Sequence, residues 1–215
     1  GKHTQSYACG DKKLKVLNVL NKATAGNTQK IINNKITTGN ASSVGKFTAT
    51  GIGCEIFNDY ENNIASSTYA HAEGSGTKAT APSTHAEGSG TAASNTYAHA
   101  EGNSTTASGI SSHAEGENTT ASGYCSHAEG YNTVADGGYS HAEGYNALAS
   151  GWYSHAGGIN SKAKAEASFA HGMYAVSDYR GGAAFGVSNK TKDALFVVGN
   201  GSPGGSYESD ALVLD

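Results

Sequence analysis

The sequence predicts an all-β fold, a parallel β-roll or β-solenoid with 14 residues in each coil. The tetrapeptide HAEG begins at His71 and recurs every 14 residues as far as His141, and HAGG follows at His155. Only 37% of the 215 residues are hydrophobic and 30 are glycine, so an ordinary globular core is hard to assemble. The repeat also lacks the 3.6-residue apolar period of helical repeats, which leaves a stack of short strands and turns.

Each unit is expected to contain two short strands separated by turn residues. A second column of alanines, usually within TxA or TxAS, keeps the same interval as HAEG. Its members are Ala65, Ala79, Ala93, Ala107, Ala121, Ala135, Ala149 and Ala163. Stacked coils pair as parallel strands about 4.8 Å apart, so ten coils would make a rod on the order of 50 Å long.

The repeat divides the chain into three parts. Residues 57–201 are predicted to form the β-roll, in which the letters change near the end while the register survives, as in Phe169-Ala170-His171-Gly172. Residues 1–56 do not match the repeat and are expected to form a β cap or a connection to a preceding shaft, with strands at 12–21 and 29–38. Residues 202–215 form a C-terminal extension.

Alternation along the HAEG strand places histidine and glutamate on one face and alanine on the other. The last repeats carry Phe169, Phe185 and Phe196 in the histidine and glutamate columns, which favours the coil interior for both columns. We expect a mostly buried ladder in which each glutamate faces a histidine of its own or the next coil, because unpaired buried carboxylates are heavily penalised. The ladder residues are His71, Glu73, His85, Glu87, His99, Glu101, His113, Glu115, His127, Glu129, His141, Glu143 and His155.

The alanine columns then lie on outer faces of the coil, where close approach of another backbone would keep them small. A coil of two short strands is also too thin to bury much apolar surface alone. The sequence therefore predicts that several chains associate along their length, as a homotrimer.

Composition and charge exclude several partners and cofactors. The net charge of −4 and the lack of a Lys/Arg cluster argue against nucleic-acid binding. No run approaches the roughly 20 apolar residues of a membrane span, so this segment is not expected to insert into a membrane. Cys9, Cys54 and Cys125 are too few and too scattered for a disulfide framework or a zinc site, and we expect them to be unpaired.

The stretches Ser112-His113-Ala114-Glu115-Gly116 and Ala121-Ser122-Gly123 resemble the head repeat of YadA-like trimeric autotransporter adhesins, which reads roughly S-V-A-I-G-x-x-A-x-A-S-G. The HAEG version, with the ending 194–201, is similar to tail-fibre and neck-appendage proteins of bacteriophages and prophages. The resemblance covers residues 60–201. It implies a left-handed parallel β-roll, a trimer and a place at or near a host-binding tip.

Catalytic, metal and ice-binding interpretations compete with this one. Ser-His and His-Glu pairs resemble parts of a hydrolytic triad, but six identical copies on a lattice do not make one active site, so we expect no enzyme and no catalytic residue. Imidazole and carboxylate columns can bind transition metals, yet a hydrogen-bonded ladder explains the same residues, and no metal or other cofactor is predicted. An ice-binding face is disfavoured because the neighbouring column is alanine. Its threonines would be Thr77, Thr91, Thr105, Thr119 and Thr133.

Aromatic residues crowd into the third quarter of the chain and are the predicted receptor contacts, with packing between subunits or stacking along the rod as the alternative. They are Tyr124, Tyr131, Tyr139, Tyr145, Trp152 and Tyr153. The predicted function is a structural and adhesive fibre segment of a phage or prophage tail or appendage, whose partner is a host cell-surface glycan or protein. The alternative is a trimeric adhesin on the bacterial cell surface.

Overall fold

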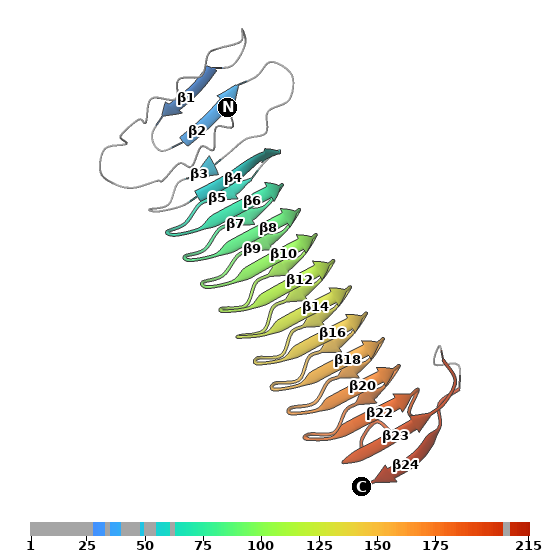
Figure 1. Cartoon of the computed structure of the whole chain (residues 1–215). Helices are drawn as coiled ribbons and strands as arrows, with labels where there is room; N and C mark the ends of the chain where they lie inside the picture. Colours follow the sequence, from blue (N-terminus) through green and yellow to red (C-terminus); the bar gives the residue numbers. More distant parts are fainter. Residues whose placement is uncertain (1–27, 33–34, 40–47, 50–54, 61–62, 204–206) are drawn as a thin grey trace.

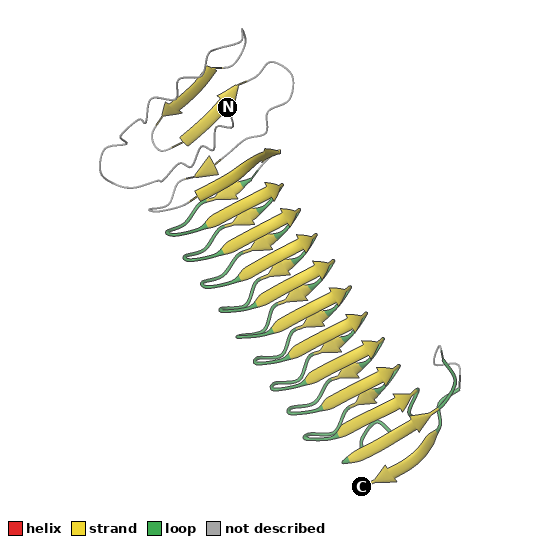
Figure 2. Ribbon diagram, in the orientation of Figure 1, coloured by secondary structure: helices red, strands yellow, loops and turns green. Residues whose placement is uncertain are grey.

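The computed structural model describes residues 28–32, 35–39, 48–49, 55–60, 63–203 and 207–215. These residues form strands and no helix, arranged as one antiparallel pair and two long sheets that are parallel except for the last strand of one of them (Figure 2). None of their segments is therefore a helix able to span a membrane. The two long sheets follow the rod from end to end (Figure 1). The prediction of an all-β parallel solenoid with 14 residues in each coil and about ten turns is confirmed.

The first long sheet, called here the long-strand sheet, has 12 strands that lie in chain order along the rod. They are β4 (Glu55–Tyr60), β6 (His71–Ser75), β8 (His85–Ser89), β10 (His99–Asn103), β12 (His113–Glu117), β14 (His127–Tyr131), β16 (His141–Tyr145), β18 (His155–Ile159), β20 (Phe169–Met173), β22 (Ala183–Val187), β23 (Phe196–Asn200) and β24 (Asp210–Leu214).

The second long sheet, the short-strand sheet, has ten strands of two residues each. They are β3 (Thr48–Ala49), β5 (Ile64–Ala65), β7 (Lys78–Ala79), β9 (Ala92–Ala93), β11 (Thr106–Ala107), β13 (Thr120–Ala121), β15 (Val134–Ala135), β17 (Leu148–Ala149), β19 (Lys162–Ala163) and β21 (Val176–Ser177).

Neighbouring coils pair in register, so equivalent residues form straight columns. His99 of β10 is level with His85 below and His113 above, and Ala107 of β11 is level with Ala93 and Ala121. Each coil therefore consists of one long strand, a tight turn, one short strand and a second turn. The sequence repeat and the structural repeat are the same 14 residues.

Small and polar residues close the turns. In several coils a serine or threonine before the long strand closes the second turn, because its hydroxyl donates to the carbonyl three residues earlier, as from Ser126 to Gly123 at 2.8 Å. Alanine stands at this position at Ala70 and Ala98. The glycine of HAEG has a left-handed backbone, with φ of +106° at Gly130. A Cβ at Gly130 would lie 2.2 Å from the carbonyl oxygen of Gly144, so only glycine lets these coils stack.

The two ends of the described region depart from the repeat. β1 (Thr28–Ile32) and β2 (Lys35–Gly39) form an antiparallel pair where a single strand was predicted at 29–38. The strand predicted at 12–21 lies outside the described residues. Parallel pairing already includes β3 and β4, and within the predicted C-terminal extension β24 folds back antiparallel against β23.

Asparagine side chains occupy the threonine column one coil before Thr77, at Asn63, and at the C-terminal end of the short-strand sheet, at Asn189. The Asn63 amide donates to Gly74 O and accepts from Thr77 N. At the other end the Asn189 amide accepts from Val176 N at 2.7 Å and donates to Val176 O at 2.8 Å, as a further strand would.

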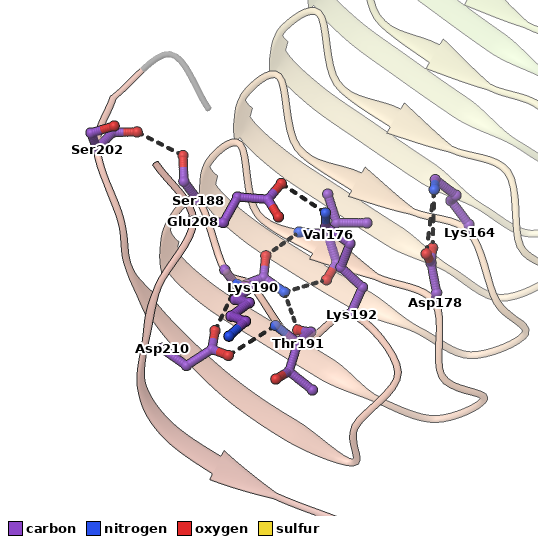
Figure 3. A network of polar contacts seen from close by, with 11 residues as sticks. Lys164, Val176, Asp178, Ser188, Lys190, Thr191, Lys192, Ser202, Glu208 and Asp210 are labelled. Atoms are coloured by element: carbon purple, nitrogen blue, oxygen red, sulfur yellow. Dashed lines mark hydrogen bonds and ion pairs between the residues drawn. The ribbon is translucent and has the colours of Figure 1, made fainter. Parts of the chain in front are cut away.

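The last turn is fixed by side chains of residues 188–210 (Figure 3). The Asp210 carboxylate accepts from the backbone N–H groups of Lys190 and Thr191, both at 2.8 Å. Lys192 and Glu208 form an ion pair at 2.7 Å. These contacts hold the segment that carries β24 against the final coil.

Candidate functional site

The side chains of the long strands face the opposite way from our prediction, which placed the histidines and glutamates inside the coil. The middle alanine of HAEG is inside the coil and fully buried, as at Ala114, whereas the His113 and Glu115 side chains are 36% and 32% exposed. The ladder thus lies on the outer face of the long-strand sheet and is not buried within the coil. The physical reason is width, because two closely spaced sheets leave room for a methyl group but not for an imidazole.

The second alanine column is corrected in the same way. Ala93, Ala107 and Ala121 are 0% exposed and face the coil interior, so the coil itself, and not a neighbouring chain, keeps them small. The threonine column is also buried, with Thr105 and Thr119 at 0% exposure. The exposed threonine face that ice binding would use is therefore not formed by this column.

The outer histidines form a continuous stack along the rod, which we call the ladder face together with the glutamates beside them. Ring centroids from His85 to His141 are 4.7 to 4.9 Å apart. The planes are nearly parallel, with an angle of 1° between His113 and His127. The stack continues through His155 into Phe169, with tilted rings.

Glutamates pair with this stack in two ways. In the first coils each His Nε2 lies nearest the glutamate of its own strand, as for His99 and Glu101 at 3.4 Å. In later coils it lies nearest the glutamate one coil earlier, as for His141 and Glu129 at 3.4 Å. Glu115 stands at the changeover, 3.9 Å from His113 and 3.8 Å from His127. The ladder thus changes once along the rod, at Glu115, from pairing within a coil to pairing between coils.

Three of the ladder histidines favour the neutral form. Burial lowers the pKa of His85, His99 and His127 below the ordinary value of 6.5, and the adjacent imidazoles lower it further. Nearby glutamates act in the opposite direction but more weakly. A stack of imidazoles less than 5 Å apart resists protonation because each added charge repels the next.

We expect the folded protein to lose stability as the pH falls below about 6.5. The folded-state pKa of these histidines lies below the unfolded value, so the unfolded chain takes up protons first. Their contribution is complete above pH 6.5 and is lost as the pH falls towards the folded-state pKa. Melting temperatures across this range measure the effect, and a variant with glutamine at residues 85, 99 and 127 should respond less. A wild-type melting temperature that rose on acidification would contradict this prediction.

Where a serine precedes a ladder histidine, the two side chains do not form a nucleophile and base pair. The Ser126 hydroxyl is buried and donates to Gly123 O, while His127 points out of the coil. The same hydrogen bond recurs at Ser112, Ser140 and Ser154. Sequence reasoning missed this turn-closing role, although its signal was present in the serine that precedes the histidine in four consecutive repeats, from Ser112 to Ser154.

The predicted receptor-contact residues form two separate groups. Tyr124, Tyr139, Trp152 and Tyr153, here the turn aromatics, lie in the turns before the long strands. Tyr139 stacks on Tyr153 at 5.2 Å and 8°, and its ring centroid is 6.3 Å from that of Trp152. Tyr131 and Tyr145, the strand-end tyrosines, stack on each other at 5.1 Å where the long strands end. The two groups therefore lie at opposite edges of the long-strand sheet.

The turn aromatics border a shallow, open pocket. Its lining comprises Ser150, Gly151, Trp152, Tyr153, Lys164 and Glu166. Trp152 and Tyr153 are 56% and 57% exposed. A Cβ on Gly138 would lie 3.2 Å from the Trp152 ring, so the second glycine of ADGGYS makes room for the indole to lie against the preceding coil. Exposed apolar rings thus stand beside an amine and a carboxylate.

Polar pairs fix the charged side of this pocket. Glu166 binds Arg180 at 2.9 Å and Lys164 binds Asp178 at 3.2 Å, each one coil apart. Cys125, in the turn between Tyr124 and the next strand, is a free cysteine, while Cys9 and Cys54 lie outside the described residues. The arrangement offers ring faces for stacking and charged groups for hydrogen bonding.

Fold and surface together define a class, the parallel β-solenoids with short coils. No protein-family model matches the chain, and no curated protein does.

Proposed function

We propose that this chain is a segment of a trimeric fibre or appendage of a phage or prophage, and that it presents a surface that binds the host cell. The repeat S-H-A-E-G-x-x-T-x-A-S-G supports the proposal, because its period and frame resemble those of YadA-like adhesin heads. In this proposal the coil is left-handed and three copies pack in parallel about a common axis. The location is the virion tail or appendage.

The observation that carries the trimer is the composition of the ladder face. The histidine stack passes into the rings of Phe169, Phe185 and Phe196. The ring centroids of Phe169 and Phe185 are 5.2 Å apart, and those of Phe185 and Phe196 are 5.7 Å apart. These rings lie on the outer face of the sheet and are only partly buried by their own chain. Three ladder faces that meet along the axis would cover them. The adhesin heads carry valine and isoleucine at the same repeat positions, which suits the same contact.

The turn aromatics are the proposed receptor contacts. A tryptophan or tyrosine ring can stack on the apolar face of a sugar, while neighbouring polar groups bind its hydroxyls. Trp152 and Tyr153 supply two rings, and Lys164 and Glu166 supply a donor and an acceptor beside them. The proposed partner is therefore a host cell-surface glycan, with a host protein as the second possibility.

A bacterial surface adhesin of the same fold is the other candidate, favoured by the shared Ala121-Ser122-Gly123 frame. A secretion signal and a membrane anchor in the complete gene would support the adhesin. Neighbouring tail-assembly genes would support the phage appendage.

Replacing Trp152 and Tyr153 with alanine should weaken binding to a glycan array or to host cells by about tenfold or more, because stacked rings contribute most of such contacts. The matched control replaces Tyr131 and Tyr145, an equally aromatic pair at the opposite edge, and should bind as the wild type does. Equal binding by all three proteins would assign the turn aromatics to packing along the rod.

Sedimentation of the same proteins tests the assembly. The wild type and both variants should sediment at three times the 21.8 kDa mass of one chain. A folded wild-type monomer would overturn the trimer while leaving the result of the binding assay to stand on its own.

A further inference from the structure

The ladder is interrupted at one coil. Along the glutamate column the register runs from Glu143 through Gly157 to His171, so one position has no side chain and the next has an imidazole. Gly157 does not need glycine for its backbone, since its φ lies outside the left-handed range that marks Gly158 beside it. Glycine at residue 157 is therefore explained by the space that a side chain would fill and not by the backbone conformation.

That space is where two side chains meet. A Cβ on Gly157 would lie 2.5 Å from Nδ1 of His171 and 2.9 Å from Oε1 of Glu143. These two atoms are 4.0 Å apart across the gap. His155 Nε2 approaches the same Glu143 oxygen at 3.3 Å. Two imidazole nitrogens and one carboxylate oxygen thus converge, all within 4.8 Å of one another.

The histidine stack changes its order at this coil. From His85 to His141 the rings are parallel within 11°, and each group of three possible ligands found there takes its histidines from this one column. The His155 ring turns by 53° relative to His141. His171 belongs to the other column and lies 6.1 Å from Phe169, which ends the stack. Only here do two histidines from different columns face one carboxylate, among the groups of three that the described residues form.

We propose that Glu143, His155 and His171 bind a divalent transition metal ion, represented by Zn²⁺, over Gly157. Two imidazoles and a carboxylate suit Zn²⁺ in preference to Mg²⁺ or Ca²⁺, which favour oxygen ligands. Ligand atoms about 2.0 to 2.1 Å from a tetrahedral zinc are about 3.3 Å from each other. The spacing between His155 and Glu143 already has this value, and His171 needs to move by less than 1 Å towards Glu143.

The site has a fourth position that water or a bound group can fill. All three ligands belong to one chain, so a single copy suffices to form the metal site, and in the proposed trimer this site would lie on the face that meets the axis. The site is separate from the proposed receptor contacts. Bound metal would link three successive coils across the place where the repeat changes from HAEG to its aromatic form. The expected consequence is a local clamp that stabilises this part of the rod.

Titration of the metal-free full chain with zinc chloride, followed by calorimetry and elemental analysis, tests the proposal. The wild type should bind one tightly held zinc per chain. H171Q removes a ligand, and G157A keeps all three ligands but places a methyl group in the gap. Both variants should bind zinc at least about tenfold more weakly. H85Q, which changes a histidine of the regular stack that lies outside every such group of three among the described residues, is the matched control and should retain wild-type affinity.

Substitution with cobalt provides a second measurement, because a visible ligand-field absorption band should appear in the wild type and be lost in H171Q and G157A. Circular dichroism checks that each variant is folded, and either folded variant suffices for the test. No stoichiometric zinc in the wild type, wild-type affinity in the folded variants, or an equal loss in H85Q and H171Q would overturn the site.

Discussion

Ala93→Leu should destabilise the solenoid severely, while Ala92→Leu should leave it folded. Ala93 is 0% exposed and is level with Ala79 and Ala107 in the coil interior. Three additional carbon atoms have no space between the two sheets, and overpacking of this kind costs about 1 to 3 kcal/mol in ordinary cores. The cost here should reach or exceed the upper value, because the coil cannot widen without breaking its pairing with both neighbours.

Ala92 is the matched control in the same two-residue strand. Its side chain points to the outer face, in a column that already contains Val134 and Leu148. Urea unfolding followed by circular dichroism measures both variants. Equal unfolding midpoints would show that the alanine at residue 93 is not confined, and would contradict the interior assignment.

Gly88→Ala should have an effect of similar size for a different reason. Gly88 has a φ of +108°, and an added Cβ would lie 2.1 Å from the carbonyl oxygen of Gly102 in the next coil. The backbone strain alone costs about 1 to 3 kcal/mol. The contact with the next backbone adds to it, so we expect a loss of about 3 kcal/mol or more in the free energy of unfolding.

Gly90→Asn provides the comparison two residues away. Gly90 also has a positive φ, of +66°, but the nearest atom to its added Cβ is a serine side chain at 3.6 Å. Its column carries Asn118 and Asn132 in the same backbone conformation. The change should therefore alter the free energy of unfolding by no more than about 1 kcal/mol, which the same unfolding curves measure. If both variants lost the same free energy of unfolding, steric contact between coils would not be the cause of the Gly88→Ala effect.

The fold could be predicted from the sequence because its period is explicit. A repeat of 14 residues with two small-residue columns leaves few structures other than a stack of coils, and the observed register matches His99 with His85 and His113. The direction of the side chains could not be read from alternation, which defines two faces without saying which is inside. Phe169 and Phe185 led to the wrong assignment of the ladder columns to the coil interior, because these phenylalanines lie on the outer ladder face.

A stricter signal for the interior was present. The position of Ala72 and Ala114 keeps alanine through every coil up to Ala184, while the ladder positions accept histidine, glutamate, glycine, phenylalanine and alanine. Tolerance of many sizes indicates an outer face, and a fixed small size indicates a narrow interior.

The candidate surfaces were predicted only in part. The aromatic residues were identified from their crowding, but their separation into two groups depends on position within the coil. Tyr124 and Tyr131 are seven residues apart, which is half of a 14-residue coil and so places them at opposite edges. The convergence of Glu143 and His171 depends on side-chain directions over an empty position, which no spacing rule supplies.

The asparagine that ends the short-strand sheet limits how the rod can grow. An unpaired edge strand is a template on which another molecule can add, and open parallel sheets are prone to fibril-like polymerisation. Both backbone polar groups of Val176 are occupied by the Asn189 amide, and β24 runs antiparallel across β23, so the parallel register stops there. A second rod therefore finds no matching edge at this end, and head-to-tail filaments are disfavoured in a molecule whose strands would otherwise stack without limit.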